Sequence, residues 1–153
     1  MVLAAGTNAP SFELRDGLGN IHRLSDYAGK TFVLYFYPKD GTSGCTKEAC
    51  SFRDSYEEFK DAGVDVIGVS PDSETSHSKF SEKYELPFTL LSDPDHKVCE
   101  AYGAWGVKKM YGREYEGVYR TTFIIGPDGG IKHVFEKVKP TEHSQEVLQA
   151  VMA

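Results

Sequence analysis

Two cysteines five positions apart are the residues with the clearest capacity for chemistry in this chain. Cys45 and Cys50 lie in "YPKDGTSGCTKEACSF", which follows an apolar aromatic run and a turn-rich loop. Such a pair could bind a metal, form a structural disulfide, fill a core as small apolar residues, or react as thiols. The surrounding sequence weighs these four uses against one another.

A metal site is poorly supported by the spacing. Structural zinc sites take four Cys or His ligands in closely spaced pairs. Here Cys45 and Cys50 have no matching second pair, because Cys99 stands alone and the histidines are scattered singly along the chain. We therefore expect no metal ion at these cysteines.

A disulfide between Cys45 and Cys50 conflicts with the helix that the following residues predict. Residues five apart on a helix differ by about 7.5 Å of rise and roughly 140° of rotation, so their Cα atoms lie about 8 to 9 Å apart. A disulfide needs a Cα separation below about 7 Å. Closing so short a loop would also constrain little of the unfolded chain. The two thiols cannot bond while this helix is intact.

The position of Cys45 favours a reactive thiol. The "GTSG" loop becomes the first helical turn at Cys45, where unpaired backbone N–H groups and the positive end of the helix dipole surround the sulfur. Such surroundings favour the thiolate, which is the nucleophilic form. Thr42 can turn its hydroxyl toward the sulfur, and Pro38 fixes the angle at which the chain leaves the preceding strand. The plainer alternatives are burial as small apolar residues for the cysteines and ordinary turn chemistry for Pro38 and Thr42.

The elements that must position this loop alternate between strands and helices. A continuous β-branched and aromatic run predicts a central strand from Thr31 to Tyr37, directly before the loop. Apolar spacing from Cys45 onward predicts one helix, which Gly63 ends as a left-handed cap. The other predicted elements are a hairpin or strand pair in "FELRDGLGNIHRLSDY", a strand from Val64 to Ser70, a polar helix from Ser73 to Tyr84, a short strand and helix on either side of Asp93 and Pro94, a hairpin in "YRTTFIIGPDGGIKHVFEKV", and a last helix from Thr141 to Met152.

This order of elements predicts an α/β fold. Strands joined through helices should be parallel and the late hairpin antiparallel, which gives a mixed central sheet flanked by helices. The pattern is compatible with a thioredoxin-like core that carries an N-terminal β-hairpin extension. At 153 residues the chain has the size of one compact domain, and we expect residues 1–153 to form it.

Composition excludes several classes of partner. A net charge of −6 gives no general attraction to nucleic acid or anionic lipid. The chain lacks an apolar run of the roughly 20 residues that a membrane span needs, and its N-terminus lacks the basic start and apolar centre of a signal peptide. Three cysteines, an odd number, argue against a fully paired secreted protein. We expect a cytoplasmic protein with no nucleic-acid or membrane partner.

A family resemblance rests on the loop and on four further segments. "PKDGTSGC" fits the Pro-x-x-x-Thr-x-x-Cys signature of the peroxiredoxins, and "FYPKDGTSGCTKEACSFRD" resembles the peroxiredoxin Q, or bacterioferritin comigratory protein, branch. The similarity continues through "GTNAPSFEL", "VIGVSPDS", "LLSDPDHKV" and "RTTFIIGPDG". It implies a thioredoxin-like fold and thiol-dependent reduction of hydrogen peroxide and organic hydroperoxides in antioxidant defence, with no bound cofactor or metal.

The same resemblance implies roles for individual residues. Cys45 would be the peroxidatic cysteine, whose thiolate attacks a peroxide oxygen and becomes a sulfenic acid. Thr42, backbone N–H groups and Arg120 in "YRTTFII" would stabilise the moving charge, with Pro38 shielding the thiolate and Glu48 in "CTKEA" orienting Arg120. Taken without the resemblance, Arg120 reads as a solvent-facing residue at a strand end, and Glu48 as a favourable acid in the first turn of a helix.

Cys50 resembles a resolving cysteine that shares one helix with the peroxidatic one. For Cys50 to attack the sulfenic acid at Cys45, the first turns of the helix must unwind. The resulting disulfide would then be reduced by an external dithiol, for which thioredoxin is expected, and the branch is often monomeric. Cys99 matches neither role and is interpreted as a half-buried structural residue.

Three other functions use the same residues. A non-enzymatic peroxide sensor could employ the same thiol switch without turnover. A thioredoxin-like disulfide reductase is disfavoured because such enzymes use Cys-x-x-Cys. A cysteine hydrolase is disfavoured because no histidine lies in a signature that would activate Cys45.

Overall fold

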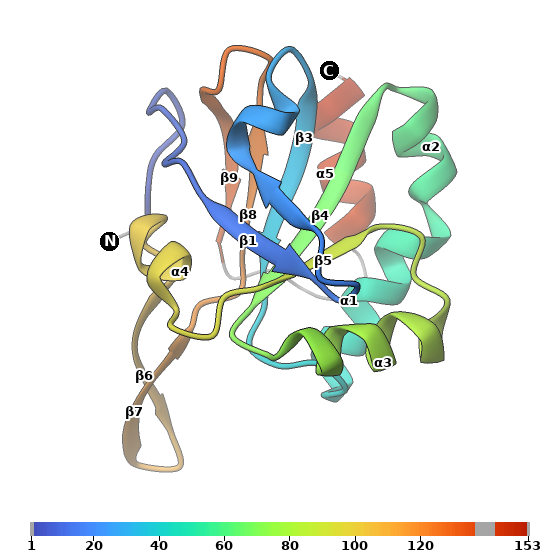
Figure 1. The fold of residues 1–153 in the computed structure, drawn as a ribbon. Helices are drawn as coiled ribbons and strands as arrows, with labels where there is room; N and C mark the ends of the chain where they lie inside the picture. The colour runs from blue at the N-terminus through green and yellow to red at the C-terminus, as the bar shows by residue number, and fades with distance from the viewer. Residues whose placement is uncertain (1, 137–142, 153) are drawn as a thin grey trace.

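The computed structural model describes residues 2–136 and 143–152 (Figure 1). The strands are β1 Glu13–Asp16, β2 Ile21–Arg23, β3 Thr31–Phe36, β4 Val64–Ser70, β5 Thr89–Ser92, β6 Trp105–Met110, β7 Arg113–Val118, β8 Thr121–Ile125 and β9 Ile131–Phe135. The helices are α1 Ser43–Asp54, α2 Tyr56–Asp61, α3 Glu74–Tyr84, α4 Lys97–Ala101 and α5 His143–Met152, with a 3-10 turn at Leu24–Tyr27.

Seven strands form one sheet in the order β2-β1-β5-β4-β3-β8-β9. Strands β3, β4 and β5 are parallel and are joined through helices, whereas β8 is antiparallel to both β3 and β9. Strands β1 and β2 form an antiparallel pair at one edge of the sheet. The predicted mixed sheet with an N-terminal hairpin is therefore confirmed, and the thioredoxin-like fold with it.

Strand β3 separates two clusters of buried apolar side chains. Alternate residues face opposite sides of the sheet, because the side-chain period of a strand is two. The α4-side cluster takes Phe32, Leu34 and Phe36 from β3 and packs them against Cys99 and Tyr102. The α1-side cluster takes the alternate residues of this segment and packs them against α1, α2, α3 and α5; it includes Val33, Tyr35, Tyr37, Cys45, Ala49, Phe52, Phe59, Phe80 and Val147. The end of β3 thus leads directly into the side of the molecule that α1 covers (Figure 1).

The helix predicted to run unbroken from Cys45 to Gly63 is instead two helices. α1 ends at Asp54 and α2 begins at Tyr56, with Ser55 between them at φ −101° and ψ 4°. The buried Ser55 hydroxyl lies 3.2 Å from the Ser144 hydroxyl of α5 and accepts a hydrogen bond from the Gln145 amide at 3.0 Å. The apolar spacing continues across Ser55, so the sequence pattern gave no sign of a break in the helix. The break coincides with the contacts that Ser55 makes with the distant helix α5. Gly63 has φ +74°, as a cap residue requires.

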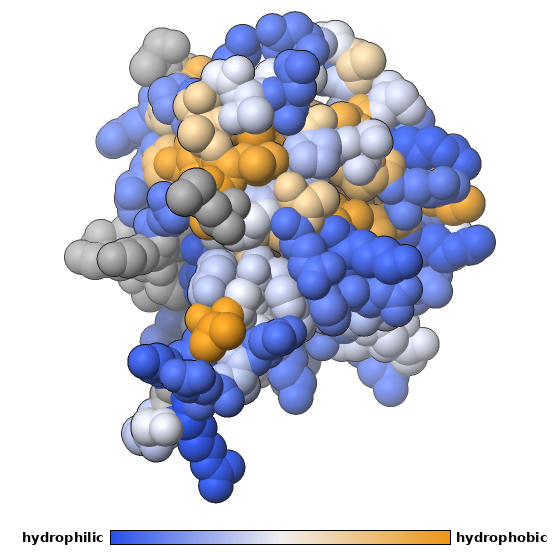
Figure 2. All heavy atoms as spheres, turned by 90° about the vertical axis from the view of Figure 1, so that its left-hand side faces the viewer, coloured by the Kyte–Doolittle hydropathy of each residue, from blue (hydrophilic) through white to orange (hydrophobic). Residues whose placement is uncertain are grey.

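A third hairpin, formed by β6 and β7, was not predicted from the sequence. Its two turn residues, Tyr111 and Gly112, have φ of 53° and 76°, the pattern of a type I′ turn. The usual sign of such a turn is Asn-Gly or Asp-Gly, and here a tyrosine takes the first place. The hairpin projects away from the main sheet (Figure 1), and Figure 2 shows that its surface is largely hydrophilic. The weak apolar pattern of an exposed hairpin explains why it escaped prediction.

The remaining predicted elements agree with the structure. β4 and the hairpin of β8 and β9 lie where they were expected, and Ser73 caps α3 by accepting a hydrogen bond from the Ser76 amide. The late hairpin was predicted in a segment that ends at Val138 and α5 was predicted from Thr141; residues 137–138 and 141–142 of these predictions lie outside the described residues. None of the helices described is both long enough and apolar enough to cross a membrane.

Candidate active site

Cys45 lies in the first turn of α1, where the sequence placed it. Thr42 is the N-cap residue of this helix, and the Cys45 side chain is buried, with 2% of its surface exposed. The Nη2 group of Arg120 donates a hydrogen bond to the Cys45 sulfur at 3.3 Å. A buried thiol thus lies in the first turn of a helix and accepts a hydrogen bond from a cation.

Arg120 holds Glu48 as well as Cys45. Its Nη1 group donates to Glu48 Oε1 at 2.8 Å, and Glu48 is fully buried one turn after Cys45. The arginine side chain is only 20% exposed, so the alternative of a solvent-facing strand-end residue is wrong. Strand pairing explains the encounter: Phe36 of β3 is paired with Thr121 of β8, which brings the residue before β8 beside the end of β3.

Burial gives the two charged residues different electrostatic properties. Burial raises the pKa of Glu48 to about 7, although Arg120 opposes that rise. Burial by itself would lower the pKa of Arg120, but Glu48 and Cys45 together hold the pKa of the guanidinium above its usual range. Arg120 is therefore a permanent cation at the sulfur, while Glu48 titrates near neutral pH.

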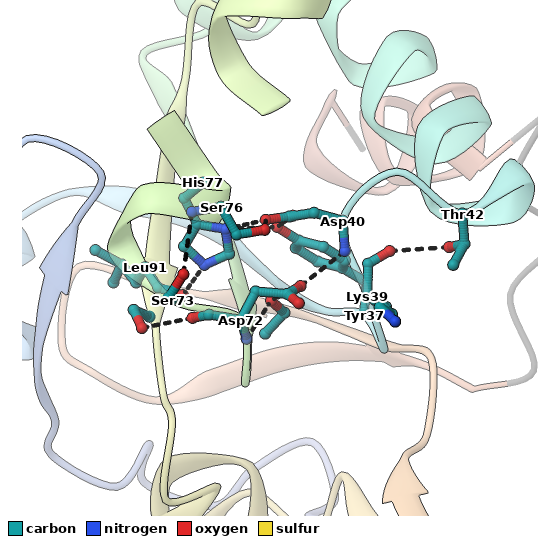
Figure 3. A network of polar contacts seen from close by, with 11 residues as sticks. Tyr37, Lys39, Asp40, Thr42, Asp72, Ser73, Ser76, His77 and Leu91 are labelled. Atoms are coloured by element: carbon teal, nitrogen blue, oxygen red, sulfur yellow. Dashed lines mark hydrogen bonds and ion pairs between the residues drawn. The ribbon is translucent and has the colours of Figure 1, made fainter. Parts of the chain in front are cut away.

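The loop before α1 carries Pro38 and Thr42. Pro38 is half-buried and Thr42 is exposed. The Thr42 hydroxyl donates a hydrogen bond to the carbonyl of Lys39 at 2.9 Å (Figure 3). The structure thus brings Cys45, Glu48 and Arg120 together, whereas the Thr42 hydroxyl bonds to a carbonyl of its own loop. The roles of Thr42 and Pro38 stay predictions.

Cys50 and Cys99 occupy different surroundings. Cys50 is a free, half-buried thiol on the same intact helix as Cys45, five positions further on, as the argument from helix geometry expects. Cys99 is a free thiol in the α4-side cluster, on the other side of the sheet from Cys45. It is fully buried, more so than the half-buried position expected, and burial raises the pKa of its thiol. Its position separates it from the Cys45 site.

Comparison with known proteins places the chain in a family. The model of the AhpC/TSA family matches residues 5–134. The chain belongs to the AhpC/TSA family. It is 50% identical over 151 residues to Peroxiredoxin Bcp of Bacillus subtilis (strain 168), covering 99% of this chain and 96% of the relative. It is 49% identical over 146 residues to Peroxiredoxin Bcp of Escherichia coli (strain K12), covering 95% and 94%.

Solved structures agree with this membership. The bacterioferritin comigratory protein of Xanthomonas campestris, studied for its alkyl peroxide reduction activity, superposes with a TM-score of 0.91 at 38% identity and covers 97% of both chains. A peroxiredoxin Q structure from Xylella fastidiosa gives a TM-score of 0.92 at 34% identity, with 99% and 96% covered. The peroxiredoxin Q interpretation of the sequence is therefore confirmed.

The sequence did not indicate the surroundings of two residues near the site of this peroxiredoxin, Asp40 and His143. Asp40 stands inside the quoted "YPKD" segment, and its partners come from distant elements (Figure 3). His143 lies at the start of α5, fully buried, with Nε2 2.6 Å from the Thr122 hydroxyl. Burial, with the positive charge of Arg120 as a further cause, lowers the pKa of His143 to about 4. A lone histidine carries no local signal of such surroundings.

Proposed function

We propose that this thiol peroxidase reduces hydrogen peroxide and organic hydroperoxides with Cys45 as the attacking thiolate. The contact of Arg120 Nη2 with the Cys45 sulfur, at 3.3 Å in the first turn of α1, is the observation that carries the assignment. The thiolate attacks one peroxide oxygen and the O–O bond breaks. Cys45 becomes a sulfenic acid, and the leaving hydroxide or alkoxide takes up a proton.

Fixed charges around the sulfur support this step. Negative charge moves from the sulfur to the leaving oxygen during the reaction. A permanent cation beside these two atoms stabilises the transition state and so lowers the activation barrier. Arg120 supplies the cation, and Glu48 fixes the orientation of its planar group through the 2.8 Å contact. Thr42 is proposed to bind the peroxide through its exposed hydroxyl, and Pro38 to limit access of water to the thiolate.

Cys50 is proposed to resolve the sulfenic acid. Its thiol attacks the Cys45 sulfur, a disulfide forms and water leaves, which requires the start of α1 to unwind. Ser51, the next residue, lies 2.5 Å hydroxyl to hydroxyl from Ser144 of α5, a contact that would limit unwinding to the turns before it. A dithiol such as thioredoxin then reduces the disulfide to two thiols.

Three broader properties complete the proposal. The two apolar clusters share the strands of one sheet, which supports a single domain over residues 1–153. We further propose a cytoplasmic, monomeric protein, in keeping with a mechanism that draws both cysteines from one helix.

The deciding experiment follows peroxide consumption with a thioredoxin system. Wild type should turn over continuously, and Cys45→Ser should lose all activity because a hydroxyl is barely ionised at neutral pH. Cys50→Ser is the matched variant: it should form one sulfenic acid at Cys45 and then stop, and it should over-oxidise more readily. Continued turnover by Cys45→Ser would refute the assignment, and a wild type that stops after a single peroxide would favour the sensor.

A further inference from the structure

Asp40 lies at the centre of a buried group of hydrogen bonds, here called the Asp40 network. Its carboxylate accepts a hydrogen bond from the Tyr37 hydroxyl at 2.5 Å and from the Ser76 hydroxyl at 2.8 Å. One carboxylate oxygen lies 2.7 Å from Nδ1 of His77, and the Asp40 backbone N–H donates to Asp72 at 2.7 Å (Figure 3). The His77 side chain is 0% exposed and that of Asp40 5%, so these contacts are shielded from water.

Both ring nitrogens of His77 have partners that bear on its protonation. Its Nε2 lies 2.9 Å from the carbonyl oxygen of Leu91, which can only accept, so Nε2 carries a proton. Asp40 accepts hydrogen bonds from two hydroxyls, as an ionised carboxylate does, and an ionised Asp40 in turn requires a proton on Nδ1, which lies 2.7 Å from its oxygen. The geometry points to an imidazolium at His77 that forms a buried ion pair with Asp40. Removing one partner of such a pair leaves the other charge uncompensated.

A metal ion is the competing explanation for this group. Ligand atoms of Asp40, Asp72 and His77 lie within 4.8 Å of one another, as in a cation site. However, Asp72 Oδ2 already accepts from the Asp40 N–H and from the Ser70 hydroxyl, each at 2.7 Å. The Nδ1 atom that would bind a metal instead faces a carboxylate as a donor. Other protein groups already form hydrogen bonds with these atoms, so a role in holding the loop in place fits them better than metal binding.

The Asp40 network fastens the loop that precedes α1. Asp40 stands two residues before the N-cap residue Thr42 and five before Cys45. Its partners come from α3 and from the segment after β4, and His77 in turn contacts Leu91 of β5. The loop is therefore fixed at the end of the sheet where all three parallel strands terminate.

We propose that Asp40 and His77 are positioning residues for the Cys45 thiolate. Within the described part of the chain their hydrogen bonds reach neither the sulfur nor Arg120, and they act by holding the start of α1 where the thiol meets Arg120. A displacement of about 1 Å at a reacting group can cost on the order of 100-fold in rate. This inference rests on the proposed function, because it assumes that Cys45 is the reacting residue.

The first test is His77→Gln, which removes the charge at similar size. Its rate of sulfenic acid formation with limiting peroxide, measured by rapid quench and mass spectrometry, should fall roughly tenfold or more. The matched control is His22→Gln, because His22 makes similar contacts, with Asp16 at 2.8 Å and the Tyr27 hydroxyl at 3.0 Å, in the β1–β2 hairpin. The control should keep the wild-type rate. A folded His77→Gln protein with the wild-type rate would overturn the proposal.

Two further measurements separate positioning from a general loss of stability. Asp40→Asn should slow the reaction to a similar extent, and the Asp40→Asn, His77→Gln double variant should lose no more than either alone; additive losses would argue against a functional pair. In the wild type, nitrogen NMR should show both ring nitrogens of His77 protonated at pH 7. A neutral ring would overturn the ion pair even if the variants did not fold. Retained activity in Cys45→Ser would instead count against the proposed function.

Discussion

At the scale of single residues, the site depends on one arginine that makes two contacts. Arg120 donates to the Cys45 sulfur and to Glu48 from two different nitrogens of its planar group. A lysine would keep the charge, but its single ammonium nitrogen cannot reproduce this fork. The geometry of the donor, rather than its charge alone, is therefore expected to matter.

Arg120→Lys should slow peroxide reduction roughly 10- to 100-fold while the protein remains folded, because one of two oriented contacts is lost. Stopped-flow oxidation under single-turnover conditions measures this rate. Arg23→Lys, at an exposed ion pair with Glu13, is the matched control and should react like the wild type. Equal rates for Arg120→Lys and the control would show that charge alone suffices.

Glu48 should make stability depend on pH near neutrality. Its folded pKa is raised from an ordinary value near 4.5 to about 7, so the native state binds the extra proton between these values. This contribution to stability is fully present below pH 4.5 and is lost as the pH rises through 7. Urea unfolding of wild type and Glu48→Gln between pH 4.5 and 8 should show that the free energy of unfolding of the wild type falls, relative to that of the variant, as the pH rises. A difference that stays constant over this range would contradict it.

At the scale of elements, α1 must be stable enough to activate Cys45 and weak enough to unwind. Ser51 near its C-terminal end and its C-cap residue Ser55 both lie within hydrogen-bond distance of Ser144 of α5. The first turns of α1 carry both the reacting thiol and the proposed resolving thiol. Helix propensity between the two cysteines should therefore control how fast they join.

Lys47 tests this directly, because it is exposed on α1 between the cysteines. Glycine is about 1 kcal/mol less favourable than alanine in a helix, which corresponds to roughly a fivefold change in an equilibrium. After one equivalent of peroxide, Lys47→Gly should form the Cys45–Cys50 disulfide up to about five times faster than Lys47→Ala. Alkylation quench and mass spectrometry report the rates. Identical rates would mean that unwinding does not limit resolution.

At the scale of the whole molecule, α5 connects helix α1, which carries Cys45, with strands β8 and β9. His143 packs against Phe52 of α1 and Phe135 of β9 with ring centroids 5.6 and 5.5 Å apart, and it also contacts Thr122 of β8. One neutral, buried histidine thus joins three elements. Its protonation would put an unpaired charge inside the α1-side cluster.

His143 should make the fold sensitive to acid. Its folded pKa of about 4 lies below the ordinary 6.5, so its contribution to stability is present above pH 6.5 and is lost as the pH falls toward 4. The loss should amount to a few kcal/mol. Because Glu48 acts in the opposite direction over part of this range, His143→Gln should lessen the acid loss and expose the effect of Glu48. Urea titrations from pH 4 to 7 measure both; an unchanged acid loss in His143→Gln would contradict the prediction.

The local features could be predicted from the amino-acid sequence alone. The position of Cys45 at a helix start, the conflict between Cys50 and an intact helix, and most of the order of elements along the chain follow from side-chain periodicity and turn residues, which depend on neighbours in the chain. The loop motif and its companion segments were enough to predict the family. The break at Ser55 and the hairpin of β6 and β7 were missed because neither leaves a strong local pattern.

Which distant side chains meet depends on tertiary packing; the family resemblance had implied the meeting of Arg120 and Cys45, but no local pattern indicated that of Asp40 and His77. Arg120 reaches Cys45 because β8 pairs with β3 in one register, and a shift of a single residue would turn it to the other face. His77 reaches Asp40 because α3 packs where the parallel strands end. Such contacts depend on strand pairing and on packing between elements far apart in the chain, and periodicity along the sequence carries no information about either.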